Sequence, residues 1–172
     1  MPFTPYHFGP SGFFALLFRK WIDLPVFVLA NVIIDVEVLI IGTLGLKWPY
    51  HRYAHTLLIA TAVALLWALA AYPLRNLFQY LMNLIRLPYR TTFFKMLLSA
   101  VLGAWLHVLI DAIYHYDVRI FWPANTRPLY KLLTHPQLKT LCLAFFAAAF
   151  IAYLCIVASN LKQSKADKDK SP

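Results

Sequence analysis

Charged residues are scarce in this sequence. Only 13% of its 172 residues are Asp, Glu, Lys or Arg, about half the share found in an ordinary soluble domain. Because 61% of the residues are hydrophobic, most of the folded surface must face something other than water. This composition excludes a soluble globular domain and indicates a polytopic membrane protein.

Cysteines and acidic residues are also few, and both scarcities exclude classes of protein. Cys142 and Cys155 lie in one apolar run, too far apart along a single helix to form a disulfide with each other. Against 7 acidic residues there are 16 basic ones, for a net charge of +9. The basic residues stand between apolar runs rather than in one stripe. This spacing excludes nucleic acid as a partner and is typical of membrane proteins in contact with lipid headgroups.

Four apolar runs predict an all-α bundle with about four transmembrane helices. Each run crosses, or nearly crosses, about 30 Å of hydrocarbon at a rise of about 1.5 Å per residue. They are residues 24–46, 56–74, 96–110 and 140–161. The shorter apolar segment 13–18, which follows Gly9 and Pro10, predicts an additional half-inserted or interfacial helix.

The polar segments predict how the chain is divided and oriented. Residues 1–161 form one membrane domain, and residues 162–172, rich in Lys, Asp and Ser, are expected to be a disordered basic tail. Residues 75–90 are basic and amphipathic, which fits either a helix on the cytosolic leaflet or an extension of the second span. Ten basic residues fall on the C-terminal side of the membrane and six on the other, which favours a cytosolic C-terminus.

Three acidic residues lie in or at the end of apolar runs. They are Asp35, Glu37 and Asp111. A carboxylate at the centre of a bilayer costs about 3 kcal/mol on insertion scales. Neither of the two apolar runs contains a Lys or Arg that could pair with these acids, so another kind of group must compensate their charge.

Histidines are placed to supply that compensation. His107 and Asp111 are four residues apart and therefore project from one face of a helix, and His51 and His55 repeat this spacing. Together with Asp35 from another helix, the two pairs offer the mixed nitrogen and oxygen ligands of a divalent metal site. The number of imidazoles favours zinc, with manganese or iron as alternatives.

The depth of Asp35 sets a condition on this site. In a straight helix Asp35 lies about 18 Å below the Lys47 end, whereas His55 and Asp111 lie close to that surface. We therefore expect the first span to break after Asp35. If the span is unbroken, Asp35 and Glu37 are expected to form a separate midplane site, as in a proton relay.

The order of these residues resembles a known family. The segments are His7, Ile34-Asp35-Val36-Glu37, His51-Arg52-Tyr53-Ala54-His55-Thr56, Gly103 to Asp111 and Phe121-Trp122-Pro123. From residue 7 to residue 123 they resemble the YdjM-like family of inner-membrane proteins, which are described as metal-dependent hydrolases. The family patterns are Pro-Asp-x-Asp, His-Arg-x-x-x-His-Ser and Gly-x-x-x-His-x-x-x-Asp.

The resemblance implies a bacterial inner-membrane location and a set of metal ligands. The implied ligands are His7, Asp35, His55, His107 and Asp111, to which His51 and Glu37 are added as looser matches. The sequence departs from the family at three places. Ile34 replaces the proline that would end the first helix, Glu37 replaces the second Asp, and the spacing from His51 to His55 is one residue shorter.

Together these observations predict a membrane-bound, metal-dependent hydrolase that acts on an ester or phosphoester. Glu37, or a histidine that does not bind metal, would accept the proton from the attacking water. Arg52, Arg119 and Arg127 lie near the predicted site and suit a lipid or another anionic amphiphile as substrate.

The alternative is a non-enzymatic membrane protein. It would be a small transporter, a proton-conducting protein or a scaffold whose His and Asp residues are structural. Transporters tend to have paired, Gly- or Pro-interrupted spans in two related halves, and this sequence has no such pairing. We interpret His115 and Asp117 as interfacial hydrogen-bonding residues in either case.

Overall fold

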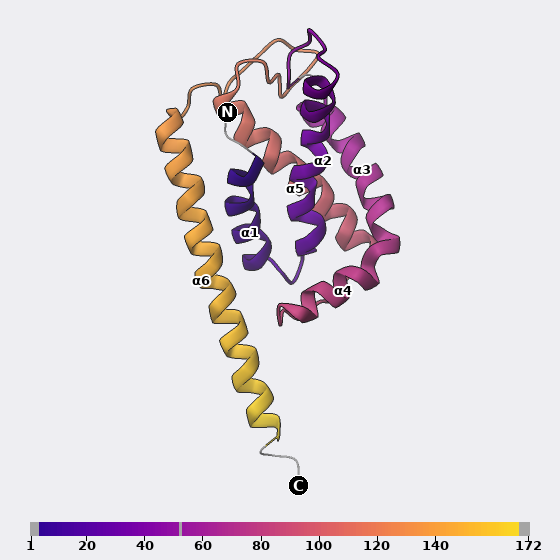
Figure 1. The fold of residues 1–172 in the computed structure, drawn as a ribbon, viewed down its shortest axis with the longest axis vertical. Helices are drawn as coiled ribbons and strands as arrows, with labels where there is room; N and C mark the ends of the chain where they lie inside the picture. The colour runs from indigo at the N-terminus through magenta and orange to yellow at the C-terminus, as the bar shows by residue number, and fades with distance from the viewer. Residues whose placement is uncertain (1–3, 52, 169–172) are drawn as a thin grey trace.

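The computed structural model describes residues 4–51 and 53–168, and every regular element in that part of the chain is a helix (Figure 1). The elements are η1 (Thr4–His7), α1 (Phe8–Leu17), α2 (Leu24–Thr43), α3 (Leu57–Ala71), η2 (Tyr72–Leu74), α4 (Arg75–Leu84), α5 (Phe93–Tyr114) and α6 (His135–Lys168). Four stretches are long and apolar enough to cross a membrane: α2, Leu57–Leu84, α5 and His135–Gln163. The predicted all-α membrane bundle is therefore confirmed.

Helix α5 crosses the bundle diagonally behind α2 (Figure 1) and packs against both α2 and α3. One face of α5 is buried at every fourth residue: Met96, Ala100, Ala104, Val108 and Ala112. On α3 the buried residues are all alanines: Ala60, Ala64, Ala68 and Ala71. Small side chains at this spacing let two helix backbones approach closely inside a membrane.

Helices α2 and α5 approach closely at Gly103. A Cβ atom at this position would lie 2.4 Å from the Phe27 carbonyl oxygen and 2.9 Å from the Cβ of Ala30. The two helices cross at an angle, and both rise toward the same end of the bundle (Figure 1). Asp35 is eight residues beyond Phe27, and Asp111 is eight residues beyond Gly103, so both carboxylates rise about 12 Å above this contact. Close packing at Gly103 thus brings the two acids to the same level.

The predicted break after Asp35 is wrong, because α2 continues without interruption to Thr43. The connection from α2 to α3 instead folds back along α2. There the backbone N–H groups of Tyr53 and Ala54 donate hydrogen bonds to the Glu37 carboxylate at 2.8 and 3.0 Å. This return brings the following residue, His55, to the level of the acids. An unbroken first span therefore does not separate Asp35 and Glu37 from the histidines.

The short N-terminal helix is confirmed, but it begins earlier than expected. α1 starts at Phe8 and includes Gly9 and Pro10, both buried. Proline is tolerated in the first turn of a helix, where its missing N–H is not needed. A Cβ at Gly9 would lie 2.4 Å from the Cys142 carbonyl oxygen on α6. α1 therefore packs inside the bundle, between α2 and α6 (Figure 1).

The C-terminal helix is longer than the apolar run that predicted it. α6 extends to Lys168, so the predicted disordered tail is helical as far as this residue. Once a helix is nucleated, each added Lys, Gln or Ala costs little. Residues 169–172 lie outside the described residues. Cys142 and Cys155 are both on α6 and both free, as expected.

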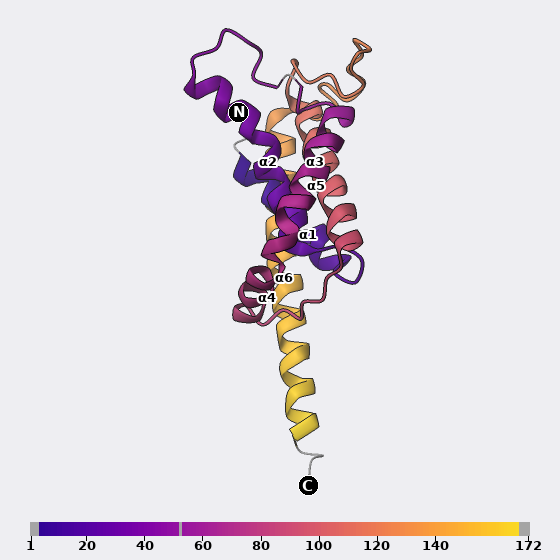
Figure 2. The ribbon, with the colours of Figure 1, turned by 90° about the vertical axis from the view of Figure 1, so that its right-hand side faces the viewer.

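Helix α4 turns away from the axis of α3 at η2, which contains Pro73 (Figures 1 and 2). Phe78 and Met82 of α4 are buried, whereas Leu77 and Leu84 are exposed. Of the two alternatives for residues 75–90, this geometry favours a helix that lies across the end of the bundle.

Candidate metal centre

Four side chains converge in the interior of the bundle, and each offers one ligand atom within 4.8 Å of the other three. They are Asp35, His55, His107 and Asp111. The Nε2 atom of His107 lies 3.2 Å from Asp35 Oδ1 and 3.2 Å from Asp111 Oδ2. The Nε2 atom of His55 lies 3.5 and 3.4 Å from the same two oxygens. Two imidazoles and two carboxylates thus face one point.

Each of these side chains is positioned by a simple local feature. Asp111 lies one helical turn beyond His107 on α5, as the four-residue spacing predicted. His55 precedes Thr56, whose hydroxyl oxygen accepts the N–H of Ile59 at 3.2 Å and caps the start of α3. This cap fixes the backbone next to His55, so the imidazole enters the bundle from the end of α3.

Three of the four residues of the centre are buried, and the Asp35 side chain is 18% exposed. His55 and His107 are 0% exposed, and Asp111 is 2% exposed. The Nε2 atoms of both histidines are close to carboxylates but make no hydrogen bond of normal geometry. A buried polar group without a partner costs about 1–3 kcal/mol. A divalent cation among the four side chains would satisfy these atoms and neutralise the two carboxylates.

The charge of His55 fits the same interpretation. Burial lowers the pKa of this imidazole, but its contacts with Asp111, Asp35 and Glu37 outweigh burial and hold the pKa well above its usual value. These contacts favour the protonated form of His55 in the absence of metal. Metal ligands must be deprotonated, so binding of a cation would release that proton.

Two further carboxylates are hydrogen-bonded to the Nδ1 atoms of His55 and His51, on the side of each ring away from the centre. Glu37 Oε2 lies 3.2 Å from Nδ1 of His55. Both oxygens of Asp117 lie 3.1 Å from Nδ1 of His51, and the backbone N–H of His51 donates to Asp117 at 3.0 Å. Despite partial burial, these bonds to His51 lower the pKa of Asp117 to about 2. Carboxylates behind ligand histidines orient the rings in many metal sites.

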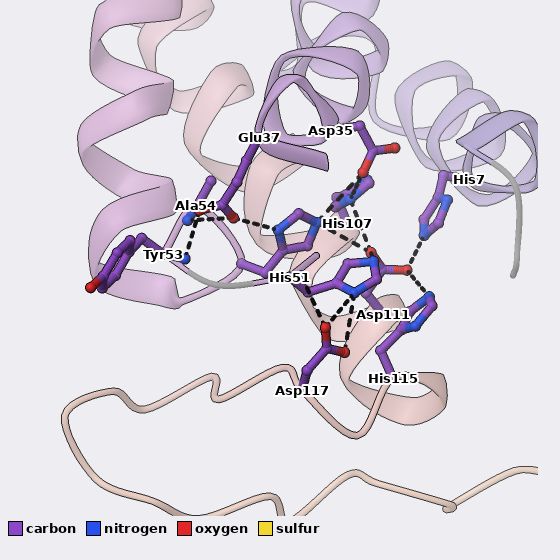
Figure 3. Close-up of polar contacts among 11 residues, drawn as sticks. His7, Asp35, Glu37, His51, Tyr53, Ala54, His107, Asp111, His115 and Asp117 are labelled. Carbon is purple, nitrogen blue, oxygen red and sulfur yellow. Dashed lines mark hydrogen bonds and ion pairs between the residues drawn. The ribbon is translucent and has the colours of Figure 1, made fainter. Parts of the chain in front are cut away.

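Asp111 is the common neighbour of a larger histidine cluster (Figure 3). Its Oδ1 atom is 3.0 Å from Nε2 of His7 and 4.0 Å from Nε2 of His115. Its Oδ2 atom is 4.0 Å from Nε2 of His51. The rings of His51 and His115 are 3.8 Å apart, centroid to centroid, and with Asp117 these two residues make a second group that could hold a metal ion.

The six residues that the sequence predicted as metal ligands all lie around this centre. They are His7, Asp35, His51, His55, His107 and Asp111. Glu37, predicted as the proton acceptor, is placed behind His55. The interpretation of His115 and Asp117 as interfacial residues missed their place beside the centre. The spacing of His107, Asp111 and His115 along one helix face was the signal that could have found His115.

Two cavities are lined by residues that surround the centre, and Tyr53 lines both. One, of about 550 Å³, is also lined by His51, Asp117, Arg119 and Arg127. The other, of about 470 Å³, is almost entirely apolar and is lined by residues that include Glu37, Ile40 and Trp48. Arg52, which was expected near the substrate, lies outside the described residues. Basic and apolar surfaces thus meet next to the histidine cluster.

The fold and the centre define an all-helical, four-span membrane protein with a buried His and Asp group that could hold a metal ion. The chain matches the family model described as YdjM inner membrane protein over residues 11–166, and it therefore belongs to that family. The match confirms the resemblance and extends it into α6. His7 lies before the matched region. Searches of curated proteins and of solved structures found no match.

Proposed function

We propose that this protein is a metal-dependent hydrolase that acts on an ester or phosphoester of a lipid or another anionic amphiphile. The observation that carries the proposal is the buried convergence of Asp35, His55, His107 and Asp111. Such a group is costly inside an apolar bundle unless a cation joins it. The family name indicates an inner membrane, and we expect this to be a bacterial one.

The four convergent residues would hold a divalent cation, and the two imidazoles favour zinc over manganese or iron. His7 and His51 are close enough to Asp111 to join the same ion or a second one beside it. When bound, the metal supplies Lewis acidity, which polarises the scissile bond and makes water a better nucleophile at neutral pH.

Glu37 is available for ligand orientation and proton transfer, and His115 is available as a further metal ligand. Glu37 is hydrogen-bonded to Nδ1 of His55, so it orients this ligand. Its role as the proton acceptor stays a prediction. Burial and the neighbouring His51 lower the pKa of His115 to about 4. His115 is therefore neutral at pH 7 and has a free electron pair that can bind metal, but so low a pKa makes it a weak proton acceptor at this pH.

The two cavities support an amphiphile as the substrate class. Arg119 and Arg127 would bind a phosphate or another anionic headgroup. The apolar cavity beside Ile40 and Trp48 would accept a hydrocarbon chain. Because Tyr53 lines both cavities, one molecule could occupy both with its ester next to the centre.

The proposed orientation places this chemistry on the outer face of the inner membrane. The centre lies where α2 and α5 approach their C-terminal ends, at the end of the bundle opposite the C-terminus of α6 (Figure 2). With the C-terminus in the cytosol, as the distribution of basic residues favours, the two cavities open on the opposite side.

Metal analysis of the purified protein tests this proposal. We expect detergent-purified protein to retain at least about one divalent ion per chain. A chelator should remove the ion and stop hydrolysis of a phosphate-ester amphiphile, and added zinc should restore both. A metal-free preparation that binds no added zinc would favour the alternative, in which the His and Asp residues are structural parts of a transporter or scaffold.

The variant Glu37→Gln separates an orienting role from a proton-accepting one. We expect zinc affinity to fall about 10–100-fold, as it does when a carboxylate behind a ligand histidine is lost. Equilibrium zinc titration in detergent measures this change, and Glu37→Asp should recover part of the affinity. Unchanged zinc affinity together with lost turnover would contradict the orienting role and support Glu37 as the base.

A further inference from the structure

Another cavity lies at the end of the bundle opposite the metal centre. Its volume is about 630 Å³, and it is enclosed by the end of α1, the α1–α2 connection, the α4–α5 connection and the first turns of α5. Lys95 in its wall is sixteen residues before Asp111 on α5, which separates the cavity from the metal centre by about 24 Å. The two sites are therefore distinct.

The walls of this cavity combine apolar and basic side chains. Much of the surface is hydrophobic, with contributions from Leu16, Ile22, Met82, Leu87 and Leu98. Four basic residues also line it: Arg19, Lys20, Arg90 and Lys95. Among the side chains that the structure describes, none of these four pairs with a carboxylate. Arg19, Lys20 and Arg90 are exposed, so their charges can attract an anion, whereas the partly buried Lys95 also interacts electrostatically with Asp23.

Lys95 fixes the two connections that carry the other basic residues. Its Nζ atom donates hydrogen bonds to the carbonyl oxygens of Arg19 and Arg90, each at 3.0 Å. The α1–α2 and α4–α5 connections are therefore tied together across the cavity. Basic residues of both connections therefore line the same cavity, which is what recognition of a single anionic group requires.

Asp23, the acid next to this cavity among the described side chains, is kept out of it. Asp23 is 0% exposed and does not line the cavity. Its carboxylate accepts hydrogen bonds from the Val26 N–H at 3.2 Å, from the Tyr89 hydroxyl at 2.7 Å and from the Thr91 hydroxyl. These bonds also anchor the α4–α5 connection to the start of α2. Asp23 thus shapes the cavity while four cations outnumber its single negative charge.

We propose that this cavity binds an anionic phospholipid, with the phosphate among the basic side chains and part of an acyl chain along the apolar wall. Trp21 and Phe94 line the cavity and are 64% and 72% exposed, as is usual for aromatic residues at the level of the headgroups. Basic pockets between membrane helices bind anionic headgroups in this way. A free phosphate would leave the apolar part of the cavity unused.

Lipid titration of the full chain tests the charge requirement. Native mass spectrometry in mild detergent would compare phosphatidylglycerol with phosphatidylcholine of the same acyl chains. We expect the double variant Arg19→Gln, Arg90→Gln to bind phosphatidylglycerol about 25-fold more weakly, or about fivefold for each charge removed. The control Arg75→Gln, Lys162→Gln removes the same charge outside the cavity and should keep the wild-type affinity. Equal affinity of both double variants for phosphatidylglycerol would overturn the proposal.

A second pair of measurements tests the apolar requirement. The variant Leu98→Trp narrows the cavity and keeps every charge, so it should weaken phosphatidylglycerol binding while the Arg75→Gln, Lys162→Gln control does not. Glycerol phosphate, which has the headgroup chemistry without acyl chains, should fail to displace the bound lipid at equal concentration. Displacement by glycerol phosphate as effective as by phosphatidylglycerol itself would mean a site for free phosphate and would also overturn the proposal.

Discussion

Replacing Asp111 with asparagine is expected to abolish metal binding, with a fall in zinc affinity of more than about 100-fold. Asparagine keeps the shape of the side chain but removes the negative charge. Asp111 lies within 3.4 Å of the Nε2 atoms of His7, His55 and His107. No other carboxylate in the described part of the chain contacts so many of the predicted ligands. Hydrolysis should be lost together with the metal.

Metal content of the purified variant, measured beside its thermal unfolding, checks this result. His135→Ala is the matched control, because His135 lies at the same end of the bundle and packs on Tyr114, with ring centroids 4.6 Å apart, outside the metal groups. The control should retain its metal. Retention of wild-type zinc affinity by a folded Asp111→Asn variant would show that the cluster is not a metal centre.

The substitution Gly103→Ala is expected to destabilise the bundle and to reduce metal occupancy at the same time. The added Cβ would lie 2.4 Å from the Phe27 carbonyl oxygen, which is backbone and cannot move aside as a side chain could. Overpacking of this kind costs about 1–3 kcal/mol, and separation of the helices can raise the cost. Because the contact between α2 and α5 sets the distance from Asp35 to Asp111, the ligand geometry should be lost as well.

Thermal unfolding in detergent, with and without zinc, measures both effects. Gly42→Ala is the control on the same pair of helices. A Cβ at Gly42 meets only the Tyr50 ring at 3.7 Å, and alanine is favoured over glycine within a helix by about 0.5–1 kcal/mol. The control should therefore be as stable as the wild type or slightly more so. Equal unfolding temperatures and equal metal contents for the two variants would contradict the proposed role of Gly103.

The composition and the four-residue spacings were sufficient to predict much of the protein. Apolar runs predicted the four spans because the thickness of a bilayer fixes their length. The spacing of His107 and Asp111 predicted a shared face because helix geometry is local. His7 was placed only by resemblance to the family, and its contact with Asp111 through Nε2 at 3.0 Å had no signal in the spacing of the residues.

The misjudged depth of Asp35 has a clear physical origin. The prediction assumed that a straight helix runs from Asp35 to the membrane surface and that His55 stays near that surface after the turn. In the structure the connection returns along α2, held by hydrogen bonds from the Tyr53 and Ala54 N–H groups to Glu37. This return depends on contacts between Glu37 and residues sixteen and seventeen positions later in the chain. The periodic spacing of residues in helices and strands cannot predict contacts at that separation.

By itself the sequence determined that this is an α-helical membrane protein in which acids and histidines share a nonpolar interior, because hydrophobicity and helical spacing are properties of neighbouring residues. Only the tertiary structure decided that five histidines surround one aspartate, that Glu37 and Asp117 hold the outer nitrogens of two of them, and that basic cavities lie at both ends. These arrangements depend on how closely α2 and α5 approach and on where the connections return, and both are set by packing between segments far apart in the chain.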